Sequence, residues 1–83
     1  MICHMLSVID GGTEETIKYV EISSFDLEKF KKQFDVDPVS DPKMLDLYSV
    51  GPDDVDFLLG SMNVLVSFDF TSFGYFIEAV STD

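Results

Sequence analysis

The sequence predicts a single α+β domain with an antiparallel or mixed sheet and two short helices on one face. The 83 residues leave room for one hydrophobic core, so residues 1–83 are expected to form one domain. Hydrophobic residues make up 46 % of the chain and eight of them are Phe, which favours a packed interior over disorder. Strand-like alternation and helical periodicity follow each other in the order ββαβαββ.

The first half of the chain is predicted to form a hairpin and then a helix. A mostly apolar segment over 2–9 and an alternating segment over 16–22 flank a Gly-Gly turn, a pattern typical of antiparallel pairing. Apolar residues then recur at helical spacing over 25–34, after two serines that are N-cap candidates. The other face of this predicted helix holds three of the five lysines.

The second half is predicted to add a strand, a short helix and two further strands. Two prolines within 35–43 indicate a loop, and alternation over 44–50 indicates a strand. Pro52, followed by two Asp, is typical of the first turn of a helix. Alternation over 63–70, a turn, and a returning segment over 75–80 predict the last two strands.

Charge is the strongest functional signal. The chain has 16 acidic residues against five lysines, no Arg, and a net charge of −11. Such a field repels nucleic acid and anionic membranes and accelerates encounter with a basic protein. The absence of Arg also argues against bidentate recognition of phosphate or carboxylate groups. The alternative is that the acidity serves solubility alone.

Cysteine content and hydropathy indicate a cytoplasmic location. Cys3 is the only cysteine, which excludes an intramolecular disulfide. The N-terminal residues lack a basic region, so no signal peptide is predicted. The most apolar stretch, residues 57–68, is too short to span a bilayer.

No motif indicates catalysis, a metal or a cofactor. Read as a calcium loop from Asp35, the chain places Val39 and Lys43 at ligand positions and Ser40 where glycine is needed. Cys3 and His4 are consecutive in a predicted strand, so they point to opposite faces and cannot form a nucleophile–base pair. We therefore expect a protein that is not an enzyme and that needs no metal or cofactor.

The candidate binding residues cluster in the middle of the chain. Acids gather over 35–46 and 53–56, on both sides of a tyrosine, and an acidic rim around Tyr suits a Lys/Arg-rich surface. Capping of the predicted helix explains part of the second cluster. The candidate partner-binding residues are Asp35, Asp37, Asp41, Asp46, Tyr48, Asp53, Asp54 and Asp56.

The chain resembles the small acidic immunity proteins that bacteria pair with nuclease toxins, including those of contact-dependent inhibition systems. The length, the charge of −11, the run over 35–46, the stretch over 51–58 and the ending over 75–79 carry this resemblance. It implies a protein that neutralises a basic cognate toxin domain by covering its substrate-binding site or a nearby surface. The alternative is a structural or regulatory interaction domain that forms a homo-oligomer, such as a homodimer.

Overall fold

The computed structural model describes residues 1–62 and 66–81 and confirms the α+β class. Its strands form one antiparallel sheet in the order β2-β1-β4-β3. The described elements, in chain order, are β1 (Ile2–Asp10), β2 (Thr16–Glu21), α1 (Leu27–Gln33), β3 (Tyr48–Ser49), the 3₁₀ turn η1 (Pro52–Asp54), α2 (Val55–Leu59) and β4 (Phe73–Ser81).

The predicted hairpin is formed by β1 and β2. Asp10 closes it, because its carboxylate Oδ1 accepts hydrogen bonds from the backbone N–H groups of Gly12 (2.7 Å) and Thr13 (3.1 Å). Its own backbone N–H donates to the carbonyl of Glu15 at 2.9 Å. Glu14 has a φ of 61°, the left-handed conformation that tight turns require.

The centre of the sheet joins the two ends of the chain. β4 pairs with β1 along its whole length, from Ile2 opposite Ser81 to Asp10 opposite Phe73. Side chains alternate between the two faces of a strand, so directly paired residues share a face. Two such pairs, Leu6 with Ile77 and Val8 with Tyr75, are buried and form the floor of the core.

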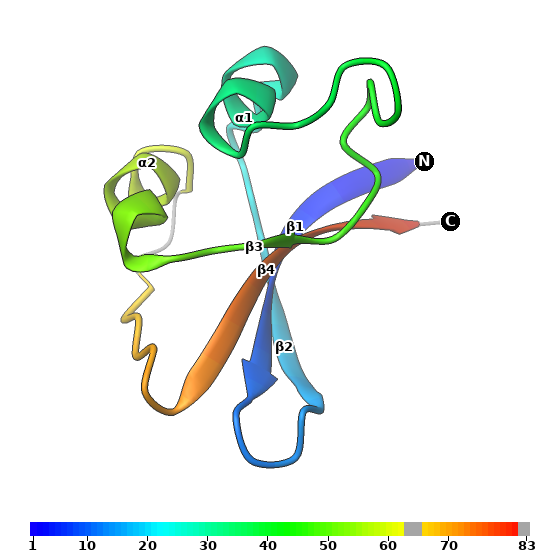
Figure 1. Ribbon diagram of the computed structural model, residues 1–83. Coiled ribbons are helices and arrows are strands. Elements are labelled where there is room, and N and C mark those ends of the chain that lie inside the picture. Colours follow the sequence, from blue (N-terminus) through cyan, green and yellow to red (C-terminus); the bar gives the residue numbers. More distant parts are fainter. Residues whose placement is uncertain (63–65, 82–83) are drawn as a thin grey trace.

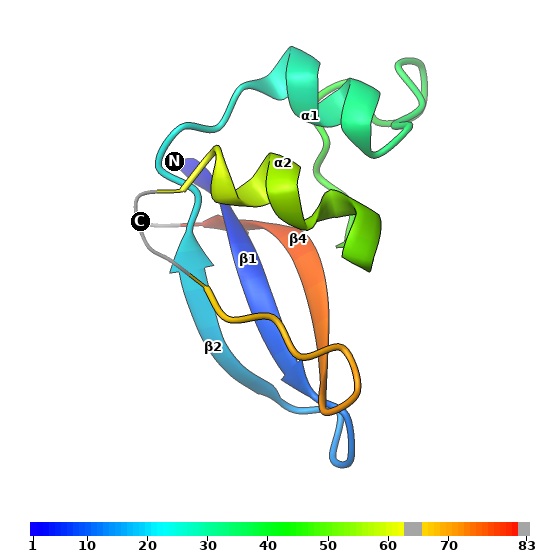
Figure 2. The ribbon, with the colours of Figure 1, turned by 90° about the vertical axis from the view of Figure 1, so that its left-hand side faces the viewer.

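Both helices and the segment that leads into β4 lie on the same side of the sheet (Figures 1 and 2). Phe30 of α1 and Leu58 of α2 are fully buried against that side. Among the described residues, the opposite side of the sheet carries no helix (Figure 2). We call the uncovered side the open face.

The start of α1 differs in detail from the prediction. Asp26, rather than Ser23 or Ser24, is the N-cap, and its side chain accepts the backbone N–H of Lys29 at 3.2 Å. The chain before Asp26 is not helical, because Phe25 places its ring on His4, with the ring centroids 3.9 Å apart and nearly parallel. Helix α1 therefore begins at Leu27.

The predicted strand over 44–50 is much shorter than expected, since only Tyr48 and Ser49 pair with β4. The carboxylate of Asp41 accepts the backbone N–H groups of Leu45 (2.8 Å) and Asp46 (3.1 Å), so these groups do not join the sheet. Met44 has a φ of 54°, which bends the chain away from strand geometry.

The predicted strand over 63–70 is not a strand in residues 66–70, and residues 63–65 lie outside the described residues. The backbone N–H of Asp69 donates to the Tyr75 hydroxyl at 2.9 Å instead of to a neighbouring strand. The rings of Phe68 and Phe70 pack on Tyr75 at 4.8 and 5.1 Å. This segment therefore packs across the helix side of the sheet and helps to cover the core.

Candidate protein-binding surface

The predicted binding residues fall into two groups that lie at opposite ends of β3 (Figure 1). Asp35, Asp37, Asp41 and Asp46 belong to the loop between α1 and β3, and Tyr48 is the first residue of β3. The second group, Asp53, Asp54 and Asp56, lies in η1 and α2. The structure therefore does not join all eight residues into one patch, and their role in binding stays a prediction.

Asp41 is the most constrained of these acids. It is only 7 % exposed, and besides two backbone N–H groups its carboxylate accepts the hydroxyl hydrogen of Tyr48. These hydrogen bonds, first of all that from Tyr48, lower the pKa of Asp41. Burial, together with the hydrogen bond to Asp41 and the charges of nearby acids, raises the pKa of Tyr48 to about 12. This carboxylate thus holds the loop together and has little surface to offer a partner.

Two further acids also have structural roles. Asp37 Oδ1 accepts the backbone N–H groups of Val39 (2.9 Å) and Ser40 (3.4 Å), and those bonds lower its pKa. Asp54 accepts the backbone N–H of Gly51 at 2.9 Å and the Gln33 side chain at 2.8 Å. Among the described residues, four predicted acids are exposed and have no hydrogen-bonded carboxylate: Asp35, Asp46, Asp53 and Asp56.

Sequence reasoning missed a groove on the open face. It has a volume of about 490 Å³ and runs over β1 and β4, from the hairpin turn to the residues just before β3. Its lining residues are Ser7, Ile9, Asp10, Gly11, Glu14, Thr16, Leu47, Gly74, Phe76 and Glu78. Ile9 and Phe76 supply half-buried apolar surface, and Leu47 beside them is 56 % exposed.

The charge around this groove has one sign. Three carboxylates line it, those of Asp10, Glu14 and Glu78, whereas none of the five lysines does. The Asp10 carboxylate is occupied by the hairpin turn, and the N–H groups of Thr13 and Gly12 lower its pKa. Glu78 is half-buried, and its carboxylate has no hydrogen-bond partner among the described residues.

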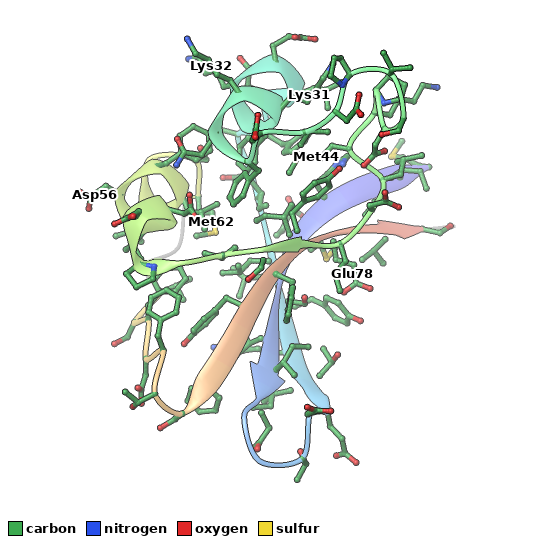
Figure 3. The ribbon with its side chains drawn as sticks, in the orientation of Figure 1. Lys31, Lys32, Met44, Asp56, Met62 and Glu78 are labelled. Carbon is green, nitrogen blue, oxygen red and sulfur yellow. The ribbon has the colours of Figure 1, made fainter. Side chains whose placement is uncertain are left out.

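Figure 3 shows that Glu78, which lines the groove, lies apart from Asp56 of α2. Glu78 projects from the side of the sheet opposite to α2, whereas Asp56 lies on the outer side of α2. Lys31 and Lys32 lie on α1, at the end of the molecule away from the hairpin turn. The groove is thus an acidic surface in its own right, distant from both the basic helix and the acids of η1 and α2.

A pattern in the sequence does point to the groove. The outward positions of a one-sided antiparallel sheet are normally polar. Here the open-face positions of β1 include Cys3, Met5 and Ile9, and those of β4 include Phe76 and Val80. Apolar residues on both faces of two strands are therefore the sequence pattern that indicates apolar surface on the open face.

Neither a metal centre nor a membrane helix occurs in the part of the chain that the structure describes. Residues 1–62 and 66–81 hold no group of three or more His, Cys, Asp or Glu side chains arranged to bind a metal ion. Over the same residues, no helix has the length and hydropathy needed to cross a bilayer.

The fold and the groove define a small α+β domain with one covered and one open sheet face. The chain belongs to the family described as "Domain of unknown function (DUF7683)", whose family model matches residues 3–78. Neither a curated protein nor a solved structure matches the chain.

Proposed function

We propose that the protein is a non-catalytic binding module that holds a basic protein on the open face of its sheet. The observation that carries this proposal is the groove, in which an apolar floor is bordered by three carboxylates and by none of the lysines. An apolar floor provides contact area, and carboxylates of one sign select a cationic partner.

Glu78 is the centre of the proposed interaction. A half-buried carboxylate beside Phe76 is less well hydrated than one on a loop, so a partner's Lys or Arg gains more from pairing with it. The aliphatic stem of that Lys or Arg can lie on Phe76 and Ile9 while its charged end reaches Glu78.

The finer proposal is that the bound protein is a toxin domain, which this chain neutralises. Its support is the resemblance to acidic immunity proteins and the net charge of −11, which suits the basic surface of a nuclease. Bound across a substrate cleft, an acidic protein excludes nucleic acid by occupying the same cationic side chains.

A test begins with the protein as bait at low ionic strength, followed by purification of the captured protein and a titration of the pair. We expect binding that weakens steeply with added salt. Glu78→Lys should weaken it by roughly tenfold or more, because a pairing becomes a repulsion. Asp56→Lys, the same change of charge on the far side of the molecule, is the matched control.

Binding that is insensitive to salt, or that falls equally with Asp56→Lys, would contradict the open-face proposal. The toxin proposal has a separate readout. If the captured protein is a nuclease, stoichiometric addition of the wild-type chain should abolish its activity. Addition of the Glu78→Lys variant in place of the wild type should leave most of that activity. A captured protein without such activity would leave the binding module standing and remove the toxin proposal.

The homodimer is the competing function for the same apolar surface. Two copies of a chain with a net charge of −11 repel each other at low salt, so self-association through the open face should strengthen as salt is added. Sedimentation velocity over a salt series distinguishes the two, because binding of a basic protein has the opposite salt dependence.

A further inference from the structure

We propose that the partner adds a strand to the sheet, by pairing an extended basic segment with the free edge of β2. This inference rests on the proposed function and specifies how the basic protein binds. It arises from the edges of the sheet rather than from the groove itself.

The two edges differ in what they offer. β3 is an edge of only two paired residues, Tyr48 and Ser49, and Pro52 follows soon after it. Short edges and nearby prolines are the usual protection against added strands. β2 is a six-residue edge without proline, and five of its six residues are exposed. Its pairing with β1 is regular from Lys18 to Glu21 and shifts register at Ile17.

The backbone of β2 is available for pairing. Within the described residues, its strand pairing is with β1 alone, and no other backbone or side-chain hydrogen bond involves Thr16–Glu21. Every second residue of an edge strand directs its N–H and C=O groups away from the sheet. From Lys18 to Glu21, where the pairing with β1 is regular, an incoming strand would find these groups already in extended geometry.

The side chains of β2 select what can pair there. Tyr19 is opposite Ser7 and Glu21 is opposite Met5, so both lie on the open face beside the groove. Lys18 and Val20 are opposite Val8 and Leu6 and lie on the other side. Directly opposed side chains across two strands come within about 5 Å of each other.

This alternation predicts the pattern of the partner segment. Cationic side chains suit the open-face positions, where they meet the Glu21 carboxylate and the ring of Tyr19, which is 48 % exposed. Apolar side chains suit the other positions, beside Val20 and the stem of Lys18. The segment is thus an extended strand in which basic and apolar residues alternate.

Charge favours such a segment over a second copy of this chain. The residues that flank β2 include Glu14 and Glu15 before it, and Glu21 ends it. Pairing of β2 with β2 of another copy would bring these acids together in two proteins that each carry a net charge of −11.

The test uses a synthetic peptide that alternates Lys and Val over the length of β2, with amide hydrogen exchange measured by NMR. Near saturation, we expect exchange of the β2 amides that face away from β1 to slow by roughly tenfold. A peptide with the same Lys and Val residues in two blocks has the same charge without the alternation. It should not protect these amides.

A matched pair of variants locates the interaction. Ile17→Lys adds a charge to the exposed edge and should weaken peptide binding by roughly tenfold, whereas Val39→Lys makes the same change in the distant α1–β3 loop and should not. The wild-type fold of each variant is checked from its amide spectrum.

The two proposals fail in different ways. If the peptide binds and Glu78→Lys weakens it, but exchange of the β2 amides is unchanged, the strand addition is overturned and the open-face proposal stands. If the β2 amides gain protection without peptide as the protein concentration rises, the partner is a second copy. If no basic peptide binds and Glu78→Lys has no effect on the captured protein, both proposals fail.

Discussion

The Tyr48 hydroxyl donates a hydrogen bond to the buried carboxylate of Asp41 and joins the α1–β3 loop to the edge of the sheet. The same carboxylate accepts the backbone N–H groups of Leu45 and Asp46. A buried charge depends on each of its donors, so this group fixes the path of the chain into β3.

Removal of the Tyr48 hydroxyl should destabilise the protein. Tyr48→Phe is expected to lower the thermal midpoint by several degrees, because it removes one donor from a buried carboxylate and leaves the ring in place. Circular dichroism at neutral pH measures the midpoint. Asp46→Asn changes an exposed acid whose carboxylate makes no hydrogen bond within residues 1–62 and 66–81, and an equally large effect there would contradict the prediction.

The same pair predicts a loss of stability at high pH. The pKa of Tyr48 rises from 10.0 to about 12 on folding, so its protonated form is favoured in the native state. A raised pKa gives stability that is fully present below pH of about 10 and is lost as the pH rises towards about 12. Denaturant unfolding at a series of pH values measures the free energy of unfolding of the wild type and of Tyr48→Phe. The difference between the two should shrink across this pH range, and a difference that stays constant would refute the prediction.

Gly11 is fixed by a close approach between the hairpin and the turn before β4. Its backbone N–H donates to the Ser72 carbonyl at 3.0 Å, and a Cβ at Gly11 would lie 2.8 Å from that oxygen. Gly11→Ala should therefore push the two turns apart and lower the free energy of unfolding by about 1–3 kcal/mol. Gly12→Ala, where the nearest atom is a side-chain oxygen at 3.3 Å, should cost less. Urea unfolding compares the two variants, and a larger loss for Gly12→Ala would count against the packing argument.

Phe30 is the residue on which the helix layer depends. It is fully buried, and its ring lies 4.6 Å from that of Phe25 and 4.8 Å from that of Phe57. Phe30→Ala should lower the free energy of unfolding by about 3–5 kcal/mol, through lost burial and the cavity left behind. Phe34→Ala, at the C-cap one turn after Phe30 and only half-buried, should cost clearly less. Equal losses in urea unfolding would show that Phe30 is not the centre of this cluster.

Local patterns predicted most of the fold. The Gly-Gly turn, the alternation of β2 and the apolar stripe of α1 depend on neighbours in sequence, so they are readable without tertiary contacts. The strand expected over 44–50 was cut short by Asp41, whose hydrogen bonds to Leu45 and Asp46 take backbone donors away from the sheet. Side-chain competition of this kind leaves no periodic trace in a sequence.

The candidate site was less predictable for a different reason. Composition alone gave the net charge, but not which carboxylates are free. Asp41 and Asp54 are engaged inside the fold, whereas Glu78 remains available beside Phe76. The groove exists only once β1 lies against β4, and that pairing is set by contacts between distant segments.

The pairing of β1 with β4 also sets an order of events in folding. β1 is synthesised before α1 and α2, yet β4, its partner in the middle of the sheet, is made only after them. Before β4 emerges, the hairpin has an unpaired inner edge and an uncovered apolar surface on both faces. Closing the long loop between β1 and β4 is entropically slow, so this sheet should form late and need protection from aggregation until β4 is complete.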